Sequence, residues 1–354
     1  TLQWAGYVLF TLGDFATSRS YLLEAVSEGE ASGNLSPVAW AYLSLSGIAA
    51  GLGNLAGAAE YLDEAEKLLM DQGDQWGLST LRGRRAVVAF AAGDRETARG
   101  FWTATLEEHE RAGNVVGVLG AQTGLLELAI AEGDLDAADQ VLAAARSTAR
   151  ISGMGEWEVS FLFHQAEIAL LRGASVEARE ALEQFLLPGQ FSVRTYMAQA
   201  RYAEALAMEG RITEAADVLE SSLDALEAWR SGLDPAGLQI YAFQIGEHVA
   251  DPDLGIASVL SGMVDSGQVR RAFDLAERQR ARHLYERMVL AEIGRHRSVE
   301  DPDGGPSIPG PPSSLDATGV LAAIPDYETA IVEFVTGRGG EPTTASVSYT
   351  HLTL

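Results

Sequence analysis

The sequence predicts a mainly α protein, an α-solenoid of stacked antiparallel helix hairpins with a short β-hairpin at the C-terminal end. Three observations predict this class: glycine-led segments recur every 40 residues, apolar residues between them follow helical spacing, and strand-like alternation appears only near the end of the chain. A solenoid hairpin buries its apolar face only against its neighbours, so a constant period is typical of stacked repeats.

Two interleaved series of glycines define the repeat. Segments such as "GNLAGAAEYLDEA" at Gly53 and "GDLDAADQVLAAA" at Gly133 begin in the first series, and the second series lies midway between them. Glycine accepts the left-handed backbone that ends a helix, and a following Asp or Asn can cap the next helix. We therefore expect one helix between successive glycines, two per 40 residues. The two series are Gly13, Gly53, Gly93, Gly133, Gly173 and Gly210, and Gly33, Gly73, Gly113 and Gly153.

Side-chain size follows the same period. Five residues after each glycine of the first series the residue is small, and four residues further on it is large. Small residues let two helices approach closely, and a large residue fills the space between hairpins. The small positions are Ser18, Ala58, Ala98, Ala138, Ala178 and Ala215, and the large ones are Leu22, Leu62, Trp102, Leu142, Leu182 and Leu219.

This pattern resembles the tetratricopeptide repeat over roughly residues 1–227, with a unit of 40 residues in place of the usual 34. The longer unit is similar to repeats of bacterial signalling and regulatory proteins. The chain departs from the pattern at Leu126 and Phe185, which occupy small positions, and at Ala174, where an Asp is expected. The resemblance implies stacked hairpins that bind a protein or peptide in a groove formed by the first helix of each hairpin.

The segments after the repeats divide the remaining chain. We expect a repeat array over 1–230, a further helical hairpin region over 231–297 with its turn at Gly267, a Pro/Gly-rich linker over 298–318, and a β-hairpin over 319–354. The linker is too poor in apolar residues to fold alone. Alternating apolar residues on either side of "GRGGEP" predict the two strands.

The C-terminal third carries a second resemblance. The segment "AFDLAERQRARHLYERM", a linker and "IPDYETAIVEFVTGRGG" resemble the entrance to a CHAT domain, a caspase-like module that follows such repeats in bacteria. In that family the catalytic His and Cys lie far beyond this hairpin, and no position here matches them. The resemblance therefore implies the truncated start of such a domain.

Composition excludes several classes of function. The net charge of −25 makes nucleic acid and anionic membranes poor partners, and the absence of cysteine excludes disulfides, thiolate metal sites and a cysteine nucleophile within this chain. The six histidines have no metal-ligand spacing, and no nucleophile lies in a pattern with a base. We expect no catalytic residue, metal or cofactor, no membrane span and, without a secretory signal pattern, a cytoplasmic location.

Candidate binding residues follow from the repeat register. Counting back from the turn glycines places acidic residues, and polar or basic ones a turn earlier, on the groove side of the first helices. Carboxylates on such a wall attract a cationic partner, although solvated surface is the alternative reading. A contact within the chain to the Arg-rich helix at 270–287 is a second expectation. The predicted groove residues are Arg84, Thr123, Glu127, His164, Glu167, Arg201 and Glu204.

These features predict a protein–protein interaction scaffold or sensor, part of a bacterial CHAT-type caspase-like protein whose peptidase portion is missing here. The alternative is the sensor array of a bacterial transcriptional or signalling regulator. Neither function requires the chain to be an enzyme, and we expect it to have no activity of its own.

Overall fold

The computed structural model describes residues 2–12, 15–51, 54–186, 193–231, 255–278, 330–335 and 344–349. The predicted linker at 298–318 lies outside these residues, as do Arg280, Arg282 and Arg287 of the Arg-rich segment. The chain divides into two compact units. Among described residues, the first contains the chain up to Ile168 and the second contains the chain from Ala169 onward.

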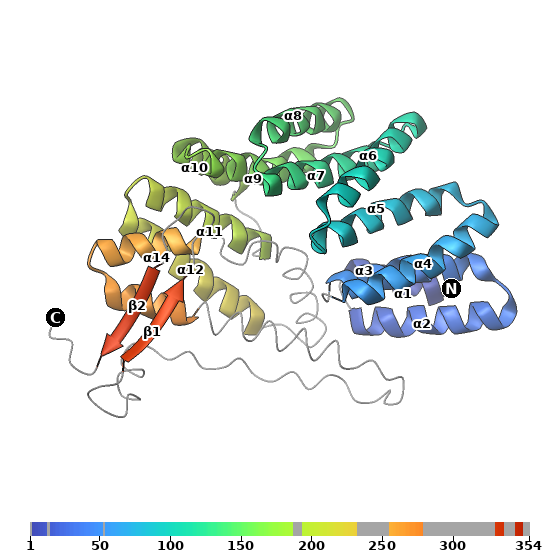
Figure 1. Ribbon diagram of the computed structural model, residues 1–354, viewed down its shortest axis with the longest axis horizontal. Coiled ribbons are helices and arrows are strands. Elements are labelled where there is room, and N and C mark those ends of the chain that lie inside the picture. Colours follow the sequence, from blue (N-terminus) through green and yellow to red (C-terminus); the bar gives the residue numbers. More distant parts are fainter. Residues whose placement is uncertain are drawn as a thin grey trace. The chain divides into compact units, whose positions relative to one another are not determined.

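The first unit is a succession of α-helices, and each helix of residues 2–151 packs on the next (Figure 1). Buried clusters pass from one hairpin to the following one, because the same helices contribute to neighbouring clusters. This is the architecture of a helical repeat, as the period predicts. The helices are α1 (Leu2–Leu12), α2 (Phe15–Ser32), α3 (Leu35–Gly51), α4 (Leu55–Gln72), α5 (Gln75–Ala91), α6 (Arg95–Ala112), α7 (Val115–Glu132), α8 (Leu135–Ile151) and α9 (Gly155–Leu171), the last reaching into the second unit.

The predicted helix ends are confirmed wherever the turn is described. The turn glycines take positive φ, among them Gly73 at 65° and Gly133 at 74°. At several turns the Asp or Asn after the glycine then accepts a hydrogen bond from a backbone N–H three residues on, as Asp134 does from Ala137 at 3.0 Å. Both features stop one helix and start the next within two residues. The same caps are seen at Asn54, Asp74, Asp94 and Asn114.

The size pattern is confirmed as packing. All six small positions are fully buried, and all six large positions lie in the core. Ala138 contributes to the cluster that joins α7, α8 and α9. Trp102, the one aromatic residue in the large series, lies against Gly124 of α7, where a side chain would overlap the indole ring. The large indole of Trp102 on α6 thus fits because Gly124 on α7 has no side chain.

The second unit contains the short second helix of the fifth hairpin and the helices that follow it. Helix α10 (Ser175–Phe185) has 11 residues, and Ala174 before it provides no side-chain cap. Helices α11 (Val193–Met208) and α12 (Ile212–Ser231) form the next pair, and α14 (Ile256–Asp265) packs against both. Gly267, with φ of 82°, makes the predicted turn into a helical segment at 269–278. Strands β1 (Ala330–Val335) and β2 (Thr344–Tyr349) pair antiparallel, with Val332 opposite Val347.

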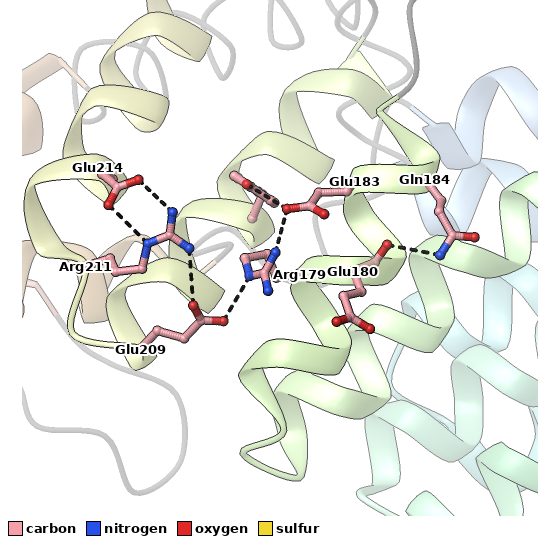
Figure 2. Close-up of polar contacts among 8 residues, drawn as sticks. Arg179, Glu180, Glu183, Gln184, Glu209, Arg211 and Glu214 are labelled. Atoms are coloured by element: carbon pink, nitrogen blue, oxygen red, sulfur yellow. Dashed lines mark hydrogen bonds and ion pairs between the residues drawn. The ribbon is translucent and has the colours of Figure 1, made fainter.

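Ion pairs connect α10 to the following hairpin (Figure 2). Arg179 contacts Glu183 on its own helix at 2.6 Å and Glu209 beyond α11 at 3.1 Å. Glu209 is shared with Arg211, which also holds Glu214 at 2.7 Å. Five charges of alternating sign thus link the end of α11 and the start of α12 to the helix that lacks a cap.

Candidate binding surface

One stripe of exposed residues runs along two neighbouring first helices, α5 and α7, which contact each other directly. On each helix the residues are spaced by four, three and four, so they share one face, and the two sets are 40 residues apart. All are exposed or half-buried. This α5–α7 stripe consists of Trp76, Thr80, Gly83 and Val87 on α5 and Val116, Gly120, Thr123 and Glu127 on α7.

The stripe has apolar side chains beside an open backbone. Trp76 is 58% exposed, Val116 56% and Val87 47%. A Cβ at Gly83 or Gly120 would meet no atom within 4 Å. Glycine inside a helix costs about 0.5–1 kcal/mol relative to alanine, and packing within the described residues does not require it at these two positions. A second backbone can approach the helices closely there.

Arg84, a predicted groove residue, crosses α3 rather than facing the stripe. Its guanidinium carbon lies 5.4 Å from the centre of the Phe10 ring on α1. The approach depends on Gly47 of α3, because a Cβ there would lie 2.9 Å from Nη1 of Arg84. Arg84 therefore connects three successive first helices through a cation–π contact.

The structure brings three predicted residues together at α7 and α9. Nε2 of His164 lies 3.7 Å from Oε1 of Glu127, and the Nδ1 side of the ring faces the backbone carbonyl of Ser160 at 3.3 Å. Glu167, one turn further along α9, adds its charge to the same neighbourhood. Thr123 lies one turn before Glu127 and donates to the carbonyl of Leu119.

This arrangement favours the charged form of His164. Burial is the largest single effect and opposes the charge, but the hydrogen bond of Glu127, the charges of Glu167 and Glu127 and the Ser160 carbonyl together raise the pKa of His164 above its ordinary value. Nδ1–H donates to the carbonyl, so the neutral ring would turn a lone pair toward a carboxylate. Protonation replaces that repulsion with an ion pair.

In the second unit, Arg201 and Glu204, two of the predicted groove residues, are buried and pair with each other. They are only 1% and 5% exposed, and Nη1 of Arg201 donates to Oε2 of Glu204 at 2.9 Å. The Glu204 carboxylate fills the space beside Gly255, where a side chain would overlap it. The expectation that Glu204 offers an open carboxylate is therefore wrong, because the start of α14 covers it.

Two arginines of the described part of the Arg-rich segment, Arg271 and Arg278, contact carboxylates of α12. Arg271 holds Glu220 through two hydrogen bonds of 2.7 and 2.9 Å and Asp217 at 2.5 Å. Arg278, two turns later, repeats the arrangement with Asp224 at 2.7 Å and Glu227 at 3.1 Å. Each guanidinium thus takes two carboxylates that lie three residues apart, which a planar fork does better than an ammonium.

The sequence pattern did not indicate the apolar half of the stripe. Trp76, Val87 and Val116 lie at ordinary helical spacing and could equally have been core residues. The two open glycines were the available signal, since neither Gly83 nor Gly120 belongs to the turn series. Among the described residues, no group of His, Asp and Glu has the arrangement of a metal site.

The comparisons with known proteins assign no family. No protein-family model matches the sequence, and no curated protein matches it.

Among the described helices, α7 alone has the length and apolar composition of a membrane span, and nearly half of it is buried inside the fold. A core helix has the same composition, and α7 packs against α6 and α8. The fold shown is a mainly α helical repeat.

Proposed function

We propose that the chain is a protein–protein interaction array of the tetratricopeptide type, acting as a scaffold or sensor in the cytoplasm of a bacterium. The observation that carries the proposal is the α5–α7 stripe. Exposed apolar surface is a common mark of a protein interaction site, and Trp76, Val87 and Val116 are exposed along this stripe. The stripe recurs at the repeat period, as a surface built for an extended partner does.

The proposed partner is a peptide segment with apolar residues and a basic face. Trp76 and Val116 supply apolar contact area, and Trp is enriched among residues that dominate binding energy. Glu127 at the end of the α7 part of the stripe is half exposed, and Glu167 adds its charge from α9, so the two carboxylates favour a cationic residue. His164 is charged when protonated and then offsets part of this field.

The proposal extends to the parent protein. The paired strands β1 and β2 after the repeats support the reading as the start of a CHAT-type caspase-like domain, with the array reporting a bound partner to it. The alternative is the sensor array of a transcriptional or signalling regulator. The full reading frame separates the two: a His and a Cys at strand ends beyond Leu354 favour the peptidase, and a helix-turn-helix favours the regulator.

A selection of phage-displayed peptides on the purified chain tests the binding surface. We expect the selected peptides to combine basic with aromatic or aliphatic residues. Gly120→Gln fills the stripe and should weaken their binding at least tenfold. Replacing a glycine inside a helix favours the helix, so the loss of binding would not come from a less stable fold. Gly100→Gln is the matched control, because Gly100 is equally open but lies on α6. Equal binding by both variants and the parent would show that the stripe is ordinary surface.

A further inference from the structure

His109, in the last turn of α6, contacts α5 through one ring nitrogen and the N-cap residue of α7 through the other. Nε2 lies 3.3 Å from the hydroxyl of Ser79 on α5, and Nδ1 lies 3.2 Å from the side-chain nitrogen of Asn114. Asn114 is the N-cap of α7, and its Oδ1 accepts from the N–H of Gly117 at 3.1 Å. The ring lies so close to Gly117 that a side chain there would overlap it.

These contacts determine the tautomer of the imidazole. Because the cap uses Oδ1 of Asn114 as an acceptor, only the NH2 group is left to face His109. An NH2 group donates, so Nδ1 must accept and carries no hydrogen. The proton of the neutral ring is then on Nε2, which donates to Ser79. Rotating the amide by half a turn would place its NH2 against the N–H of Gly117.

The same tautomer excludes nucleophilic catalysis by Ser79. Ser, His and Asn stand here in the order of a hydrolase triad, but the ring nitrogen beside the hydroxyl already carries its proton and cannot accept another. Ser79 is also buried. The constellation joins three helices instead.

We propose that His109 is a proton-operated switch for the N-terminal cap of α7. Protonation places a hydrogen on Nδ1, directly opposite the NH2 group of Asn114, and two donors cannot share that contact. The side-chain amide of Asn114 must then turn its oxygen toward the ring. This breaks the capping hydrogen bond from the N–H of Gly117 to Oδ1 of Asn114. The first turn of α7 then opens while the rest of the helix stays packed.

The charged residues around His109 do not replace Asn114 as the group that faces its Nδ1 nitrogen. On α5, Arg82 is paired with Glu108. The first two turns of α7, residues 115–121, contain no charged residue. His109 itself lies in the last turn of α6. The remaining charged groups of this part of α6 are Glu107, Glu110 and Arg111.

The switch is independent of any partner, but its consequence for binding rests on the proposed function. Val116 and Gly120 of the α5–α7 stripe lie in the first two turns of α7, and the Trp76 ring lies 6.3 Å from the His109 ring. Opening the first turn displaces Val116 from the stripe. The proton would therefore weaken binding of the proposed peptide segment.

Nuclear magnetic resonance on the unliganded chain tests the switch. We expect the Nε2–H tautomer for His109 at pH 7.5, with the signal assigned by His109→Gln. The pH is then lowered until both ring nitrogens of His109 carry hydrogen. At that point the Gly117 amide should exchange at least fivefold faster than the intrinsic pH effect predicts. The amide of Ala137 is the internal control, because Asp134 caps it and no histidine contacts that cap in the described structure.

Asn114→Asp separates the cap from the histidine. A carboxylate accepts from Gly117 with one oxygen and from protonated His109 with the other, so exchange at Gly117 should no longer respond to the proton. Three results would overturn the proposal: an Nδ1–H tautomer at pH 7.5, a ring that stays neutral until the chain unfolds, or a Gly117 amide equally protected in both protonation states. None of these results bears on peptide binding at neutral pH.

Discussion

Single residues in this array are understood only in pairs, because a side chain is allowed or excluded by the residue opposite. Trp102 is accommodated by Gly124, Arg84 by Gly47, and Glu204 by Gly255. The sequence alone places each glycine in a helix or turn but not opposite its partner, since the contact depends on how two helices are rotated against each other. The glycines at turns were predictable, and those that receive a side chain were not.

Gly124→Ala tests this pairing. The added methyl group overlaps the Trp102 indole, so the variant should lose about 1–3 kcal/mol of unfolding free energy in spite of the better helix propensity of alanine. Gly120→Ala, one turn earlier in open space, should instead gain about 0.5–1 kcal/mol. Chemical denaturation measures both. Trp102→Leu should restore Gly124→Ala, and a failure of that rescue would contradict the pairing.

His164 gives a pH-dependent prediction of definite sign. Its folded-state pKa is raised, so the stabilisation from Glu127 is complete below the unfolded value of about 6.5 and is lost as the pH rises through the raised pKa. Glu127→Gln should therefore cost about 0.2–1 kcal/mol at pH 5.5, since Glu127 is half exposed, and almost nothing at pH 8.5. A nuclear magnetic resonance titration should show a lower pKa for His164 in the variant. An unchanged pKa would rule out this account of the pair.

At the scale of elements, the repeat register could be predicted because it depends on local chemistry. Turn glycines, capping Asp or Asn residues and small residues leave a recurring signature along the sequence, and the structure places them accordingly. The weak fifth hairpin was also visible, since Ala174 cannot cap a helix. The network around Arg179 and Glu209 was not, because ion pairs between long side chains have no fixed sequence spacing.

Ala138→Leu tests the register directly. Ala138 is fully buried between α7, α8 and α9, so three additional carbon atoms should overpack the hairpin and cost about 1–3 kcal/mol. Ala143→Leu is the matched control on the exposed face of α8 and should stay within about 0.5 kcal/mol of the parent. If both variants had the parent's denaturation midpoint, the small positions would not mark helix contacts.

At the scale of the whole molecule, net charge and composition predicted less of the structure than the repeat pattern of small and large residues did. The chain carries a single lysine, Lys67, among 25 basic residues, and arginines make the ion pairs between helices. Counting back from the turn glycines predicted an open acidic groove. The structure instead pairs Glu204 with Arg201 and leaves an apolar stripe on α5 and α7, which no bulk property indicates.

The purified chain should cleave no peptide. It has no cysteine, and the hydroxyl-bearing side chain of Ser79 is buried. Fluorogenic peptides of varied sequence provide the measurement, with inhibitors present to remove contaminating proteases. Turnover that survives those inhibitors and co-purifies with the chain would contradict the proposed role as a non-catalytic array.

The most direct test of the binding surface is site-specific photo-crosslinking to a peptide from the phage selection. A photoreactive phenylalanine analogue replaces Thr123 in the middle of the α5–α7 stripe or, as a control, Thr103 on the exposed face of α6. We predict a crosslink from position 123 that excess unlabelled peptide abolishes, and none from position 103. A crosslink from position 103 without one from position 123 would place the partner on the outer helices and contradict the proposed surface.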